Sequence, residues 1–264
     1  MIRIITGVTA VIGWLSLVCY GSFYLFWFVI CALGGIGLYE YFKMIFVDRQ
    51  AGFRPFGVFI GFIPLLASVY AGPDALAAGL FVSLLLVFGF VMVRHSAIKD
   101  HFAVMAGMGF GAFYIGFCTA HLSLIKAMPH GIFWLLILTA VTAASDSGAY
   151  YAGTFFGKTK LCPVISPKKT VEGFAGGLIA AIIAVYLIST FFPRDVGKLK
   201  IIALAVPLCG LGVLGDLVES MIKRSAGIKD SGAILPGHGG ILDRADSILL
   251  TCPALYYLIY FGWV

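Results

Sequence analysis

Charged side chains are scarce in this sequence of 264 residues: only 11% are Asp, Glu, Lys or Arg, whereas 61% are hydrophobic. A soluble domain carries about 25% charged residues, so burial of this much apolar surface in one soluble core is excluded. Long unbroken apolar runs, such as 75–93 and 173–192, match the length of a membrane-spanning helix and not the short alternating strands of a β-barrel. The composition therefore predicts an all-α, polytopic integral membrane protein.

Several familiar patterns are also missing. The six cysteines form no CxxC pair, which favours small buried side chains over a metal or disulfide framework. The first apolar stretch lacks an obvious small-residue cleavage site, so we expect a retained span. Neither GxxxxGK[ST] nor a strand-linked GxGxxG is present. No internal repeat is strong enough to indicate the inverted symmetry of secondary transporters.

The apolar runs predict about nine transmembrane helices in one membrane-embedded domain, 1–264. The expected spans are 5–21, 23–44, 56–71, 75–93, 102–123, 131–151, 173–192, 199–215 and 248–264. With this pattern, 14 of the 18 Lys and Arg residues fall in one set of loops. The excess places the N-terminus and two long loops, 152–172 and 216–247, in the cytoplasm. We expect a bacterial-type inner membrane with its anionic lipids on the basic side.

Acidic residues concentrate late in the chain, where eight of the twelve lie at or after Asp146. Asp216 ends the apolar run 201–215, and Asp146 follows the run 132–144. A carboxylate at a membrane boundary is costly unless paired, so a functional role is favoured. Two plainer roles stay open: Asp216 as an interfacial residue paired with Lys223, and Asp146 as a helix-packing residue. In a continuing helix, Glu219 or Ser220 and then Lys223 would share the Asp216 face.

Asp243 and Asp246 follow a glycine-rich turn around His238 and are three residues apart. Two carboxylates at the start of a helix can share a divalent cation, although helix capping would also explain one of them. The glycines can offer backbone N–H groups to phosphate. His238 is either an acid–base group or a hydrogen-bonding loop residue. The nearby lysines and arginines can neutralise phosphates or simply set orientation.

The segment 220–246, together with 146–153, Ser166-Pro-Lys-Lys-Thr and Glu172, resembles the CDP-diacylglycerol synthases (phosphatidate cytidylyltransferases). The resemblance covers essentially the whole chain, although residues 1–130 are generic membrane sequence and 131–264 carry the motifs. It implies transfer of a cytidylyl group from CTP to phosphatidic acid in the presence of Mg²⁺. A second cation at the same site is compatible with this reaction. It implies catalytic roles for Asp216, Lys223, Asp243 and Asp246. The three aspartates are the expected metal ligands. The expected substrate-binding residues are Asp146, Ser166, Lys168, Lys169, Ser220, Arg224, Lys229, His238, Gly239, Gly240 and Arg244.

The expected partners are the two substrates and membrane lipids, and we expect no nucleic acid. A homodimer is compatible with the sequence. The nearest alternative is a CTP-dependent lipid kinase, which would release CDP instead of pyrophosphate. An ion-coupled transporter using Asp146 and Asp216 is disfavoured, because the polar residues cluster in two loops and not at mid-span. A structural membrane subunit would leave the late motifs unexplained.

Overall fold

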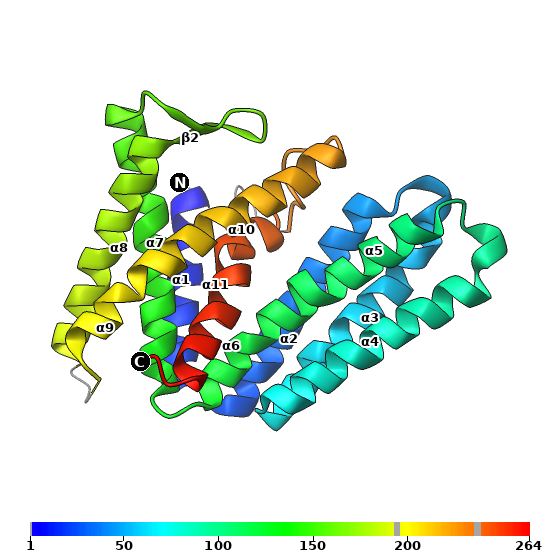
Figure 1. Cartoon of the computed structure of the whole chain (residues 1–264), viewed down its shortest axis with the longest axis horizontal. Coiled ribbons are helices and arrows are strands. Elements are labelled where there is room, and N and C mark those ends of the chain that lie inside the picture. The colour runs from blue at the N-terminus through cyan, green and yellow to red at the C-terminus, as the bar shows by residue number, and fades with distance from the viewer. Residues whose placement is uncertain (1, 193–195, 235–238) are drawn as a thin grey trace. The chain divides into compact units, whose positions relative to one another are not determined.

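The chain is described by a computed structural model that covers residues 2–192, 196–234 and 239–264, without the side chains of 2–5 and 49 (Figure 1). The described residues form mainly α-helices. These are α1 (Ile2–Tyr20), α2 (Phe23–Ile45), α3 (Arg54–Ala67), α4 (Pro73–Val93), α5 (His101–Gly111), α6 (Cys118–Ala127), α7 (Gly131–Phe156), α8 (Val171–Phe191), α9 (Lys198–Ala203), α10 (Ala205–Ser225) and α11 (Leu242–Tyr260). Strands β1 (Lys160–Cys162) and β2 (Ser166–Thr170) form an antiparallel hairpin. The predicted all-α class is confirmed.

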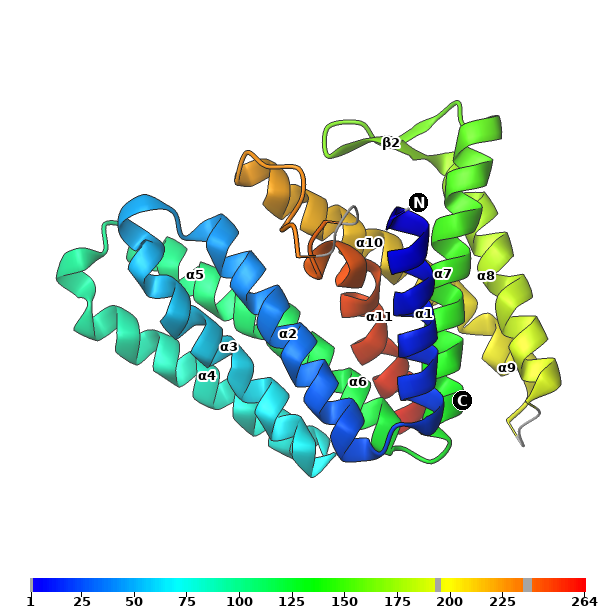
Figure 2. The ribbon, with the colours of Figure 1, turned by 180° about the vertical axis from the view of Figure 1, so that it is seen from behind.

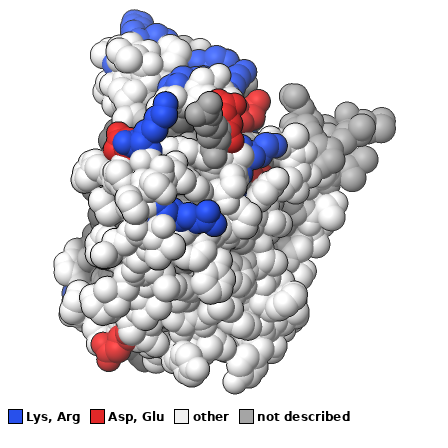
Figure 3. All heavy atoms as spheres, turned by 90° about the vertical axis from the view of Figure 1, so that its right-hand side faces the viewer, with Lys and Arg blue, Asp and Glu red and all other residues white. Residues whose placement is uncertain are grey.

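The predicted spans coincide with helical segments of the structure, although some, such as 102–123 and 199–215, run over more than one helix. The described part of the chain holds seven helical segments long and apolar enough to cross a membrane. Those seven run from Phe23 to Ser225. Helix α1 contributes a shorter apolar segment, Thr6–Tyr20, and the first two turns of α11 carry charged side chains. On the face drawn in Figure 3, most of the visible surface carries residues other than Lys, Arg, Asp and Glu. The polytopic membrane class is thus confirmed, while nine crossings stay a prediction.

Local sequence explains where several helices begin. Ser22, Asp100 and Thr170 each accept a hydrogen bond from a backbone N–H in the first turn of α2, α5 and α8, at 3.3, 2.9 and 3.0 Å. Such caps satisfy amide groups that have no partner inside the helix. Pro73 stands in the first turn of α4, where its missing N–H costs nothing.

The chain divides into two compact units, of which the first comprises Met1–Pro129 and Asp230–Ala245. Its helices approach closely where glycine replaces a side chain. A Cβ atom on Gly57 of α3 would lie 2.8 Å from the Phe42 ring of α2, and one on Gly111 would lie 2.7 Å from Tyr41. Ser83 of α4 donates a 2.8 Å hydrogen bond to the Ile60 carbonyl of α3. Small residues and interhelical hydrogen bonds are the usual means of packing in a membrane.

The second unit comprises His130–Lys229 and Asp246–Val264. Helices α7 and α8 lie side by side in both ribbon views and are joined by the β1–β2 hairpin (Figure 2). A Cβ atom on Gly148 or Gly177 would lie 2.7 Å from a backbone oxygen of the other helix, so the two backbones are almost in contact. Gly173 of α8 contributes to the same close approach, because a Cβ atom there would lie 2.9 Å from the Ala149 carbonyl oxygen of α7. The tight pair supports the hairpin that extends from its end.

Candidate active site

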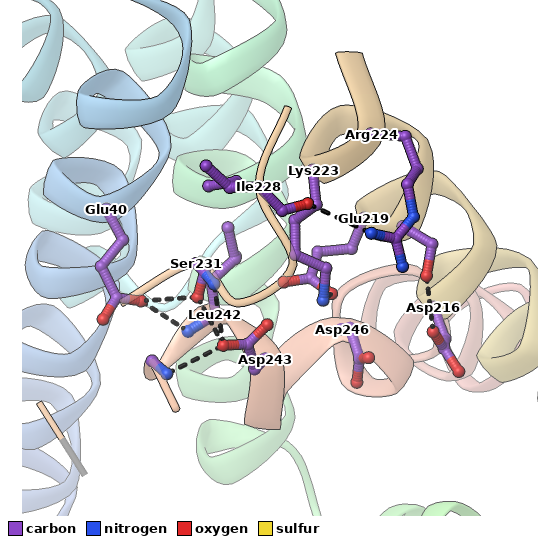
Figure 4. Close-up of polar contacts among 12 residues, drawn as sticks. Glu40, Asp216, Glu219, Lys223, Arg224, Ile228, Ser231, Leu242, Asp243 and Asp246 are labelled. Carbon is purple, nitrogen blue, oxygen red and sulfur yellow. Dashed lines mark hydrogen bonds and ion pairs between the residues drawn. The ribbon is translucent and has the colours of Figure 1, made fainter. Parts of the chain in front are cut away.

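One face of α10 carries a group of acidic, basic and hydroxyl side chains. The helix does not stop at the end of its apolar run but continues through Ser225. Asp216, Glu219, Ser220 and Lys223 therefore fall on one side at spacings of three and four, as the helical period predicts. The Ser220 hydroxyl donates to Asp216 Oδ1 at 3.3 Å, and Lys223 Nζ donates to Glu219 Oε2 at 2.5 Å (Figure 4).

Three acidic side chains converge here, which we call the acidic cluster: Asp216, Glu219 and Asp246. One carboxylate oxygen from each lies within 4.8 Å of the others. The approach of α11 to α10 depends on Gly215, because a Cβ atom there would overlap the Asp246 carbonyl oxygen. Oxygen donors at this spacing are the ligand type that Mg²⁺ and other hard divalent cations prefer. The cluster has the composition and spacing of a cation site.

The electrostatics of the cluster combine buried negative charge with two lysines. Glu219 is fully buried, and its partner Lys223 is only 12% exposed. Lys169 Nζ lies 2.5 Å from Asp216 Oδ2. Asp246 precedes the predicted span 248–264, and its burial together with the nearby Asp216 carboxylate raises its pKa to about 7. Acidic groups this close resist simultaneous ionisation unless cations are present.

Lys169 reaches the cluster from the β1–β2 hairpin. Lys160 pairs with Thr170 and Cys162 with Ser166 across the two strands. Where β2 meets α8, the Glu172 carboxylate accepts hydrogen bonds at 3.1 Å from the backbone N–H groups of Lys158 and Thr159. Thr170 caps α8 directly after Lys169. These contacts fix both ends of the hairpin and thereby set the position of Lys169.

Asp243 has a different set of contacts, which includes residues of the loop before α11 in the first unit. Its Oδ2 atom accepts hydrogen bonds from Ser231 N at 3.0 Å, Ser231 Oγ at 3.0 Å and Gly240 N at 2.8 Å. Among the described residues, the third member of the acidic cluster beside Asp216 and Asp246 is Glu219, not Asp243. A ligand role for Asp243 therefore stays a prediction, and its visible role is to organise the loop before α11.

The other predicted site residues are distributed as follows. Arg224 is exposed, and its Nη1 atom donates to the Ile228 carbonyl at 3.3 Å. Gly239 has a φ of +87°, a left-handed conformation that favours glycine. His238 lies outside the described residues. Exposed side chains are those of Asp146, Lys168, Lys229 and Arg244, whereas Ser166 is half-buried in β2.

Sequence reasoning left two acidic residues out of the site. Glu219 had a signal, because it lies one helical turn after Asp216 on the same face. Glu40 belongs to the stretch considered generic, yet an acidic residue inside the apolar run 23–44 was itself a signal. The Glu40 carboxylate accepts hydrogen bonds from Ile241 N at 3.1 Å and Leu242 N at 2.9 Å. Glu219 therefore belongs to the acidic cluster of the second unit, and Glu40 belongs to the hydrogen-bonded loop before α11 in the first unit.

Comparison with known proteins gives a consistent result along the chain. The model of the family described as "Cytidylyltransferase family" matches residues 1–261. A protein of Bacillus subtilis named phosphatidate cytidylyltransferase is 37% identical over 263 residues, which cover 97% of this chain and 96% of that protein. A protein of the same name from Staphylococcus saprophyticus is 39% identical over 66% of this chain and 68% of its own length. One from Haemophilus influenzae is 46% identical over 50% of this chain and 47% of its own length.

The family match extends through the helices that carry Asp216, Glu219 and Asp246, and it agrees with the resemblance of the segment 220–246. With a family model that spans almost every residue, the chain belongs to the cytidylyltransferase family.

Proposed function

We propose that this protein is a phosphatidate cytidylyltransferase, which transfers the cytidylyl group of CTP to phosphatidate and releases pyrophosphate. The activity named for the Bacillus subtilis relative, which matches along nearly the whole chain, supports this proposal. The observation that carries it chemically is the acidic cluster with Lys169 and Lys223 on its carboxylates. Joining two polyanionic substrates requires both cation ligands and phosphate partners, and this face of α10 supplies both kinds of group.

The cluster fits a divalent cation by the nature of its donors. Asp216, Glu219 and Asp246 offer three oxygen ligands from two helices, and their negative charges repel one another. Mg²⁺ is the cation we propose, because it prefers such ligands and commonly binds substrate phosphates at the same time. When bound, it would screen the phosphates and stabilise the charge that develops in the transition state.

The remaining chemistry falls to side chains of the chain itself. Lys169 and Lys223 now neutralise two carboxylates, and we propose that they turn to phosphate oxygens when the cation takes over that task. A phosphatidate oxygen then attacks the α-phosphorus of CTP as the bond to the β-phosphate breaks. Pyrophosphate leaves with the bonding electron pair. Phosphatidate is already an anion near neutral pH, so the step needs no dedicated base.

We further propose that the reaction takes place on the cytoplasmic side of a bacterial inner membrane. CTP is water-soluble, whereas phosphatidate has its head group at the membrane boundary. The basic residues of loops 152–172 and 216–247 support a cytoplasmic location for both loops. The acyl chains of the lipid would then enter laterally between helices.

Incubation of the purified protein with α-labelled CTP and phosphatidate, with and without Mg²⁺, tests the proposal. We expect labelled CDP-diacylglycerol and one equivalent of pyrophosphate, with formation dependent on the divalent cation. Asp246→Asn protein purified in parallel is the matched control for contaminating activity. Release of CDP with phosphorylation of a lipid would identify a kinase, and absence of any cytidylyl transfer would refute the assignment.

A further inference from the structure

Glu40 is a buried carboxylate in α2, far in sequence from the residues considered above. It is 2% exposed and lies in a helix apolar enough to cross a membrane. An ionised carboxylate in such surroundings is costly unless several donors satisfy it. The donors identified for Glu40 all come from the segment 231–242 of the same compact unit. The hydrogen bonds that offset the cost of burying Glu40 thus come from one loop.

The Glu40 carboxylate accepts hydrogen bonds from backbone amides at the start of α11. Its Oε1 atom accepts from Ile241 N at 3.1 Å. Its Oε2 atom accepts from Leu242 N at 2.9 Å (Figure 4). These amide groups stand where α11 begins, and the first amides of a helix have no partner within it. A negative charge at this end is also favoured by the helix dipole. Glu40 therefore caps α11 from a helix some 200 positions earlier in the sequence.

Ser231 connects this cap with Asp243. Its hydroxyl lies 3.3 Å from Glu40 Oε2 and 3.0 Å from Asp243 Oδ2, while its backbone N–H also donates to Asp243. Ser231 is itself buried, with 4% exposure. The hydroxyl thus lies between two carboxylates from α2 and α11. The three side chains form one hydrogen-bonded unit, which we call the Glu40 clamp: Glu40, Ser231 and Asp243.

Two glycines of the loop, Gly239 and Gly240, allow the backbone to pass close to the clamp. A Cβ atom on Gly240 would lie 2.6 Å from Glu40 Oε2 and would overlap the Ser231 hydroxyl. A Cβ atom on Gly239 would lie 2.7 Å from Asp243 Oδ2. Both distances are shorter than ordinary Cβ contacts, so a larger residue at either position would displace the carboxylate from the backbone. This is independent evidence that the loop is built to receive Glu40 and Asp243.

We infer that Glu40 is a positioning residue for cytidylyl transfer: it fixes the first turn of α11, which carries Asp243 and is followed one turn later by Asp246. The inference rests on the proposed function. Because Glu40 acts through the helix it holds, we expect its loss to lower kcat more than it changes the KM for CTP. A displacement of about 1 Å at a reacting group can cost on the order of 100-fold in rate.

Glu40→Gln is the informative change, because it keeps the shape of the side chain but replaces one acceptor oxygen with an NH2 group that faces an N–H donor. We expect kcat to fall by about 10–100-fold at saturating substrates, with a change of less than about threefold in the KM for CTP. Hydrogen exchange at the Ile241 and Leu242 amides should become faster. Ser231→Ala combined with Glu40→Gln should cost less than the product of the two single effects, because both changes disrupt one clamp.

Tyr41→Phe is the matched control, since it removes a buried hydrogen bond from the neighbouring position of the same helix. Tyr41 donates a hydrogen bond to the Gly107 carbonyl of α5 at 3.0 Å, away from the segment 231–242 that receives Glu40. This variant should keep wild-type kcat and wild-type exchange at Ile241 and Leu242. A Glu40→Gln protein within twofold of the wild-type kcat, or one that loses activity only in proportion to its folded fraction, would overturn the inference.

The exchange measurement separates this inference from the proposed function. Wild-type protein that fails to convert CTP and phosphatidate refutes the proposed function, whatever Glu40 does. Exchange at Ile241 and Leu242 needs no substrate and reports the clamp directly. Unchanged exchange in Glu40→Gln would refute the clamp even in an active enzyme.

Discussion

Lys223 and Arg224 are adjacent in sequence, yet the structure gives them different surroundings. Lys223 Nζ lies 2.5 Å from Oε2 of the fully buried Glu219. Arg224 is exposed and donates to the Ile228 carbonyl at 3.3 Å. Adjacent helical residues point about 100° apart, which explains the difference. Lys223→Gln and Arg224→Gln therefore form a pair of variants with equal charge loss and different structural consequences.

The expected stability losses follow from burial. Removing one member of a buried ion pair leaves an uncompensated charge and costs about 3–5 kcal/mol. Each kcal/mol corresponds to roughly 2–4 °C in Tm for a chain near this size. We therefore expect Lys223→Gln to lower Tm by at least about 6 °C in the absence of divalent cation. Arg224→Gln is a surface change and should stay within about 0.5 kcal/mol of wild type.

Thermal unfolding of the purified variants in detergent, with and without Mg²⁺, measures these losses. Added Mg²⁺ should restore part of the stability of Lys223→Gln, because a cation at the acidic cluster compensates Glu219. Steady-state kinetics at saturating CTP and phosphatidate should show a much larger fall in kcat for Lys223→Gln than for Arg224→Gln. Equal and small effects of the two substitutions would show that both residues serve only membrane orientation, and the reasoning from the α10 face would be refuted.

Three further predictions address the cluster, the hairpin and the topology. Asp246→Asn and Asp243→Asn should each reduce activity by orders of magnitude without preventing membrane insertion. Steady-state kinetics and membrane fractionation measure these two properties. Full activity of either variant at limiting Mg²⁺ would show that the residue is only a helix cap. Lys169→Gln removes the cation paired with Asp216 and should lower both kcat and the Mg²⁺ concentration for half-maximal activity. An unchanged Mg²⁺ titration would contradict that ion pair. Val164→Cys and Ala233→Cys, each in a cysteine-free chain, should resist an impermeant thiol reagent in intact cells and react after lysis, because both positions are exposed in loops we place in the cytoplasm. Labelling in intact cells would reverse the orientation.

The helices were largely predictable because long apolar runs impose them. A span needs all its backbone hydrogen bonds satisfied internally, so each apolar run of the right length becomes a helix. The end of such a run is less informative about the end of the helix. The apolar run before Asp216 stops at Gly215, whereas α10 continues through Ser225. Hydrophobicity indicates which residues can lie in the membrane, whereas the hydrogen bonding of the helix can continue past the last of those residues.

The site could be predicted only in part because side-chain partners depend on tertiary packing. The spacing of Asp216 and Lys223 on one helix placed them on a common face, and the structure agrees. The helical spacing also put Glu219 on that face, but no local pattern could show that Asp246 joins Asp216 and Glu219, since Asp246 comes from another helix. Asp243 lies in a motif that suggests a metal ligand, yet its Oδ2 atom accepts hydrogen bonds from loop amides.

The position of Glu40 has a consequence for how the protein is made. Helix α2 is synthesised early, and the amides of Ile241 and Leu242 follow Glu40 by 201 and 202 positions. At a translation rate of about 5–20 residues per second, the carboxylate waits on the order of 10–40 s for the amides that receive it. During that interval a costly charge is present in an otherwise apolar segment. A chain truncated before residue 231 never supplies those amides. We therefore expect incomplete products to be held poorly by the membrane and removed by quality-control proteases.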